Sequence, residues 1–180
     1  VNGRWFSHLF TLGAFFFVST KISLYWIYLT GMMLFYVAAQ ALFLRSFSKK
    51  YLVKRMTDFK AVYFSFCLTA FLFFFLIDGR FEIWYWMNSV SMHQLSLTYL
   101  FFGLSAIIRN KSKNSIHYSI IGVFSFIAIG GLNEVYALCV LALMSILFVL
   151  EQNSRKSKST ILIYFLICLT SLAVNILSLI

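Results

Sequence analysis

The chain has few acidic residues, few charges of either sign and no proline. It contains five Asp and Glu residues against 15 Lys and Arg residues, and only 11% of its 180 residues are charged. A soluble globular domain carries about 25% charged residues, which cover its water-facing surface. With 62% hydrophobic residues, this composition argues against an ordinary soluble domain.

The other absences concern chemistry. Without proline, the Pro-broken helices common in transporters are missing. The three cysteines, Cys67, Cys139 and Cys168, lie in different apolar runs and form no CxxC pair, so neither a disulfide framework nor a zinc site is indicated. The chain contains no GxxxxGK[ST], GxGxxG, HExxH or GxSxG motif, and these patterns would mark phosphate-binding loops, zinc peptidases and serine hydrolases.

What the sequence does contain is long apolar runs separated by short basic clusters. This pattern predicts an all-α, polytopic transmembrane helix bundle. Residues 4–20 are apolar but short, which favours an interfacial or re-entrant helix over a full span. We therefore expect one partial domain over residues 1–180, with that N-terminal helix and about six spans. The third span begins between residues 89 and 95 and ends at 108, and the others cover residues 22–44, 61–77, 116–130, 135–150 and 160–180.

The apolar run over residues 118–150 is too long for one span. As a single helix it would measure about 50 Å, against about 30 Å for the hydrocarbon core of a bilayer. Basic clusters flank it at both ends, so we expect it to cross twice. Gly130, Gly131 and Asn133 permit a turn, which predicts a hairpin that breaks between Gly130 and Glu134.

The basic residues predict which side each loop faces. Residues 45–60, 109–117 and 151–159 together hold 12 of the 15 Lys and Arg residues. Cytoplasmic loops of membrane proteins carry an excess of Lys and Arg, so we expect these three loops in the cytoplasm. The positive charge of these loops is typical of residues that set the orientation of membrane spans and contact the head groups of the lipid bilayer. We expect no nucleic acid as a partner.

The opposite side then collects the unusual polar and aromatic residues, which become the candidate binding site. Ionisable side chains inside or close to the membrane cost free energy, and they commonly serve a function or pair with another charge. The candidates are Arg4, Arg80, Glu82, Trp84, Trp86, His93, Gln94, Asn133 and Glu134.

Each candidate also has a structural interpretation. Glu134 is either a ligand-binding or catalytic carboxylate, or an acid that favours the start of a helix. Glu82 could pair with Asp78 for acid–base work, or both could be hydrated loop charges. Trp84 and Trp86 could stack on a sugar or belong to an interfacial aromatic belt.

The two remaining alternatives concern basic side chains. Arg4 could bind phosphate in a bidentate way, or its guanidinium could extend to the interface from an apolar helix. His93 is either an interfacial polar residue or a ligand or base.

Three short motifs resemble a family of uncharacterised bacterial multi-pass membrane proteins. They are NGRWFSHLF (residues 2–10), EIWYWMNSVSMHQLSL (82–97) and GLNEVYAL (131–138). That family is similar to the GT-C class of membrane glycosyltransferases, which take sugars from polyprenyl-phosphate donors on the outer face. The resemblance implies an enzyme of the bacterial inner membrane that transfers a sugar to a glycan or lipid acceptor.

The resemblance also implies roles for the candidates. Arg4 and Arg80 would contact the donor phosphate, Glu82, His93 and Glu134 would shape a polar pocket, and the tryptophans would stack on the sugar or the polyprenyl chain. In GT-C proteins the catalytic acidic motif lies in the first outer loop, which would precede Val1. The catalytic residues are therefore expected outside these 180 residues, and both ends of the chain are expected to be truncated.

No cofactor is required by the sequence, although the GT-C resemblance allows for a divalent metal ion in the full-length enzyme. The alternatives from other functional classes are a transporter or flippase for a lipid or envelope polysaccharide, and a non-catalytic membrane scaffold. A transporter would be expected to show inverted internal repeats, which the sequence does not display.

Overall fold

The structure, a computed structural model, describes Leu12 and residues 22–51, 56–71, 93–112, 116–150 and 155–177. These residues are all-helical: they form six long helices, with no strand among them. The predicted interfacial helix over residues 4–20 lies outside the described residues apart from Leu12. The helices are α2 (Ile22–Tyr51), α3 (Asp58–Phe71), α6 (Leu95–Ser112), α7 (Ile116–Leu132), α8 (Glu134–Leu150) and α9 (Arg155–Leu177).

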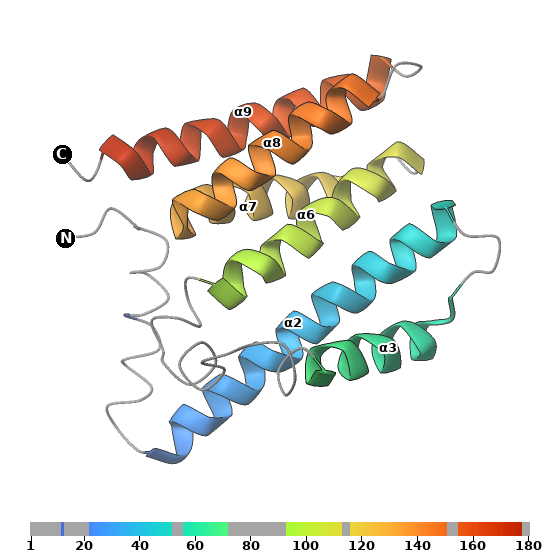
Figure 1. Cartoon of the computed structure of the whole chain (residues 1–180), viewed down its shortest axis with the longest axis vertical. Helices are drawn as coiled ribbons and strands as arrows, with labels where there is room; N and C mark the ends of the chain where they lie inside the picture. The colour runs from blue at the N-terminus through green and yellow to red at the C-terminus, as the bar shows by residue number, and fades with distance from the viewer. Residues whose placement is uncertain are drawn as a thin grey trace.

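The chain runs back and forth along one axis, as Figure 1 shows. One end of the bundle, which we call the basic end, holds the last turns of α2, α6 and α8 and the first turns of α3, α7 and α9. The start of α6, the α7–α8 junction and the last turn of α9 lie at the other end, which we call the polar end. The described parts of the three basic clusters are thus gathered at one end of the bundle.

Two helical segments are long and apolar enough to cross a membrane. They are Thr30–Tyr51, with 22 residues and a mean hydropathy of 1.2, and Lys158–Leu177, with 20 residues and a mean hydropathy of 2.3. The segments Leu95–Asn110, Ile116–Leu132 and Glu134–Val149 are also apolar but shorter. The all-helical class is therefore confirmed, whereas a bundle of six spans is not.

The basic clusters were expected to be loops, and this part of the prediction is wrong. Helix α2 continues to Tyr51, α6 continues to Ser112, and α9 already begins at Arg155. Lys and Arg have high helix propensity, and the cations Lys49 and Lys50 in the last turn of α2 interact favourably with the helix dipole. The described charges of these clusters therefore lie mostly at helix ends.

The predicted break in the long apolar run is confirmed, but the glycine Gly130 does not make the turn. Helix α7 ends at Leu132 and α8 begins at Glu134, so Asn133 alone separates them. Gly130 is a buried residue inside α7, where a Cβ would lie 2.6 Å from the Cβ of Ser171 in α9 and 2.9 Å from the Cys168 carbonyl oxygen. The glycine thus permits close helix packing, and the turn is made by Asn133.

Helix α6 packs against α2 and α7, α7 packs in turn against α9, and α9 packs against α8. Helix α3 packs on the outer side of α2. The largest apolar side chains that are fully buried in the central core are those of Leu95, Phe126, Ile129, Leu132 and Met144.

Large apolar side chains cover much of the outside of the bundle. Phe59, Ile116 and Val135 are 80%, 71% and 66% exposed. The interior meanwhile contains polar side chains, such as those of Gln40 and Ser65. Soluble monomers rarely expose so much apolar surface, and helices that pack in lipid place small and polar residues between them. Both features are typical of helices that pack in lipid.

Candidate functional site

The nine candidate residues divide into two groups. Arg4, Arg80, Glu82, Trp84 and Trp86 lie outside the described residues. His93, Gln94, Asn133 and Glu134 are described, and all four lie at the polar end of the bundle.

Two segments far apart in the sequence meet there. His93 and Gln94 immediately precede α6, whereas Asn133 and Glu134 begin α8. The rings of His93 and Tyr136 lie edge to face, with centroids 5.9 Å apart. The start of α6 therefore touches the first turn of α8, which brings the candidate residues of both segments into one region.

Asn133 has a structural role that explains its position. Its Oδ1 accepts hydrogen bonds from the backbone N–H of Val135 at 3.0 Å and of Tyr136 at 3.4 Å, and its carbonyl accepts one from Ala137 N at 3.0 Å. This geometry is an N-cap, which satisfies amides that a helix leaves unpaired. Asn133 is thus the capping residue of α8.

Glu134 is the first residue of α8 and is half-buried. The partial positive charge at a helix N-terminus stabilises an acid at this position. The same partial charge also attracts anions. Glu134 therefore contributes to the start of α8, at the same end of the bundle as His93.

Gln94 gives the strongest indication of a ligand. Its side chain is 3% exposed, and its Nε2 has no hydrogen-bond partner among the residues that the structure describes. Its backbone carbonyl accepts a hydrogen bond from Thr98 Oγ1 at 2.7 Å. A buried amide without a partner costs about 1–3 kcal/mol. A polar group that accepts from Nε2 would remove this cost.

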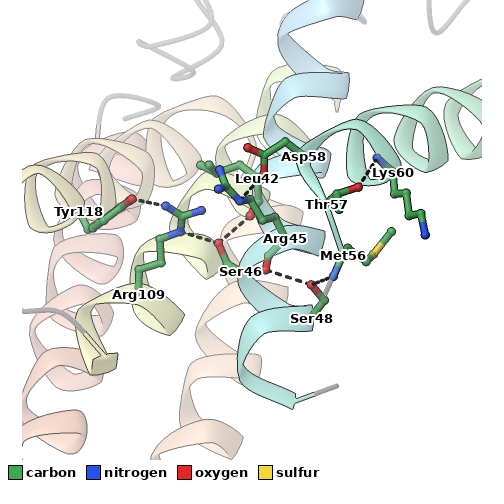
Figure 2. Close-up of polar contacts among 10 residues, drawn as sticks. All are labelled: Leu42, Arg45, Ser46, Ser48, Met56, Thr57, Asp58, Lys60, Arg109 and Tyr118. Atoms are coloured by element: carbon green, nitrogen blue, oxygen red, sulfur yellow. Dashed lines mark hydrogen bonds and ion pairs between the residues drawn. The ribbon is translucent and has the colours of Figure 1, made fainter. Parts of the chain in front are cut away.

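The basic end contains a second polar cluster, which the sequence did not indicate as a site (Figure 2). Arg109 Nε donates to Ser46 Oγ at 2.7 Å, and Arg109 also donates through Nη1 to the hydroxyl of Tyr118. Ser46 Oγ in turn donates to the Leu42 carbonyl at 2.6 Å. The guanidinium carbon lies 4.9 Å from the centroid of the Tyr118 ring. Arg109 therefore connects α6 with α2 and α7.

Asn110, the next residue, extends this cluster to α9. Its Nδ2 donates to Ser119 Oγ at 3.2 Å and to the hydroxyl of Tyr164 at 2.9 Å. The basic cluster over residues 109–117 predicts a loop at Arg109 and Asn110, but both residues lie in α6. A helix that continues beyond residue 108 would have indicated their role, because it places both side chains on α6. There they lie between the neighbouring helices.

The α2–α3 turn completes the basic end. Arg45 Nε lies 2.5 Å from Asp58 Oδ1. Ser48 Oγ donates to the Arg45 carbonyl and accepts from Met56 N, both at 3.2 Å, as Figure 2 shows. Asp58 is thus paired within the turn.

The part of the chain that the structure describes holds no cluster of three or more His, Cys, Asp or Glu side chains that could bind a metal. Cys67, Cys139 and Cys168 are free thiols. No protein-family model, curated protein or solved structure matches the chain. The similarity to GT-C enzymes stays a prediction from the three motifs, as do the roles it implies and the divalent metal.

Proposed function

We propose that the chain is part of a multi-pass membrane protein whose basic end lies in the cytoplasm. The support is that the described parts of the three basic clusters lie at one common end, because Lys and Arg near span ends are retained on the cytoplasmic side. In a bacterium this membrane is the inner one. The polar end then lies at the extracytoplasmic face.

We further propose that the polar end belongs to a GT-C type glycosyltransferase, which transfers a sugar from a polyprenyl-phosphate donor to a glycan or lipid acceptor. The observation that carries this proposal is the buried Nε2 of Gln94, which lacks a partner in the described structure. A sugar hydroxyl is a suitable acceptor for it. The N-terminus of α8 next to His93 suits the donor's phosphate.

The five candidates outside the described residues complete this proposal. Arg4 and Arg80 bind phosphate oxygens, Glu82 contributes a polar contact, and Trp84 and Trp86 stack on the sugar or the polyprenyl chain. Stacking of a sugar on an aromatic ring and bidentate pairing of arginine with phosphate are the interactions that such a donor needs.

The direct test measures sugar release from a polyprenyl-phosphate-linked donor by membranes that contain the full-length protein. His93→Ala and Glu134→Gln are compared with His117→Ala and Asp58→Asn, which make the same or a similar change at the basic end. Loss of one polar contact with the reacting complex lowers the rate about tenfold. We expect this loss for the first pair and full activity for the second. Equal effects of both pairs, or no release by the unmodified protein, would reject the assignment.

Gln94→Met separates binding from folding. If Nε2 binds the donor, this variant raises KM, and it also stabilises the protein because an unsatisfied amide is replaced by an apolar group. An unchanged KM together with increased stability would show that Gln94 does not contact the donor.

A further inference from the structure

A groove of about 300 Å³ lies at the basic end, over α6 and between α2 and α8. Figure 1 shows α6 between these two helices. Helix α2 contributes one face of its last turns, including Phe43, Phe47 and Lys50. Ile107 of α6, Leu147 of α8 and Ile161 of α9 line the rest together with further apolar residues. Its volume is at the lower end of the range for ligand sites, about 300–1,000 Å³.

The residues that line the groove favour an occupant with an apolar part and a charged part. Of the described residues that line the groove, Lys50 alone carries a charge, and most of the others are aliphatic or aromatic. Lys50 Nζ lies 5.1 Å from the centroid of the Tyr51 ring, and the rings of Phe47 and Tyr51 are 5.0 Å apart. The last turn of α2 thus places its cation next to a continuous apolar wall. An apolar chain with an anionic head matches this arrangement.

The charge around the groove favours an anion further. Lys49, Lys60 and Lys158 lie at the same end of the bundle. The acid that the structure describes at this end, Asp58, is paired with Arg45 at 2.5 Å. The described charges at this end are therefore net positive, which attracts anionic head groups.

We propose that this groove binds an anionic phospholipid of the surrounding leaflet, with an acyl chain along α6 and the phosphate at Lys50. The acyl chain gains little free energy from moving between lipid and an apolar groove, so selectivity depends on the head group. One Lys near an anionic lipid surface contributes about 1 kcal/mol, which corresponds to about a fivefold preference. The site lies at the opposite end of the bundle from the proposed sugar transfer and does not depend on that activity.

The test measures lipid retained by the purified protein in detergent by native mass spectrometry. Phosphatidylglycerol and phosphatidylcholine with identical acyl chains are offered in equal amounts. We expect the protein to retain phosphatidylglycerol about fivefold better. Lys50→Gln should abolish the preference, whereas Lys49→Gln, which removes the same charge from the exposed neighbouring residue, should keep it. Equal retention of both lipids, or equal loss in both variants, would overturn the proposal.

A second pair of variants tests the apolar part. Leu147→Trp fills the groove, whereas Ile146→Trp adds the same ring to the adjacent, 57% exposed position of α8. We expect Leu147→Trp to reduce retention of phosphatidylglycerol and Ile146→Trp to leave it unchanged. Far-ultraviolet circular dichroism verifies that each variant is folded. If both folded variants retain the lipid equally, the acyl chain does not occupy this groove.

Discussion

The contact between α7 and α9 at Gly130 makes a quantitative prediction about stability. In Gly130→Ala, the new Cβ would lie 2.6 Å from Ser171 Cβ and 2.9 Å from the Cys168 carbonyl oxygen. Because the second atom belongs to the backbone of α9, a side-chain rotation cannot relieve the overlap. Overpacking of this kind costs about 1–3 kcal/mol.

Gly31 provides the matched control. It lies inside α2 and is exposed, and an added Cβ would have no neighbour within 4 Å. Both substitutions gain the same helix propensity, about 0.8–1 kcal/mol. This gain cancels when the two variants are compared. The difference between their free energies of unfolding should therefore equal the cost of the overlap, about 1–3 kcal/mol.

The assay is unfolding of the purified protein in mixed detergent–dodecyl sulfate micelles, followed by far-ultraviolet circular dichroism. Gly31→Ala should be at least as stable as the unmodified protein, and Gly130→Ala should be less stable. Ser171→Gly removes two of the overlapping atoms, so it should restore part of the stability in the Gly130→Ala background, as a positive coupling in a double-mutant cycle. Equal stability of the two alanine variants would refute the packing of α7 on α9.

Three further substitutions test other contacts in the same unfolding assay. Asn133→Ala should destabilise the protein by about 1 kcal/mol through loss of the α8 cap, whereas Asn133→Asp should not; a cost that is equal for both would contradict the capping role. Asn110→Ala removes hydrogen bonds to Ser119 and Tyr164 and should cost about 1 kcal/mol, more than Tyr164→Phe. Asp58→Asn should lower the free energy of unfolding less than either of these, because the ion pair of Asp58 with Arg45 is partly solvated. A larger decrease would show that this ion pair stabilises the bundle.

Several features of the fold follow directly from the sequence. Long apolar runs require helices in lipid, because a helix satisfies its own backbone groups. The length of the run over residues 118–150 required a break, and Asn133 is where it occurs. The helix ends were predicted less well, because a basic cluster indicates which side of a membrane a segment faces but does not end a helix.

The contacts between helices could not be predicted in the same way. Arg109 contacts Ser46 across 63 residues of sequence, and Asn110 contacts Tyr164 across 54. Which helix faces which is decided by packing, and that information is not present in the periodicity of any single segment. Gly130 illustrates the ambiguity: a residue without a side chain suits both a turn and a close helix contact.

The arrangement of the described candidate residues could be predicted in part from the sequence. His93 and Glu134 are brought to the same end, as the charge distribution suggested. Asn133 is explained by capping. The burial of Gln94 depends on how α6 packs, which the sequence alone does not determine. For Arg4, Arg80, Glu82, Trp84 and Trp86 the roles rest on the sequence motifs.

The orientation of the two ends is tested most directly by labelling a matched pair of cysteines. His93 and His117 are both exposed and lie at the polar and the basic end. In a protein whose three native cysteines are replaced by alanine, His93→Cys and His117→Cys are treated with a membrane-impermeant maleimide. We expect His93→Cys to react in right-side-out vesicles and His117→Cys to react in inside-out vesicles. Reaction of both residues from the same side, or the reverse assignment, would contradict the proposed threading.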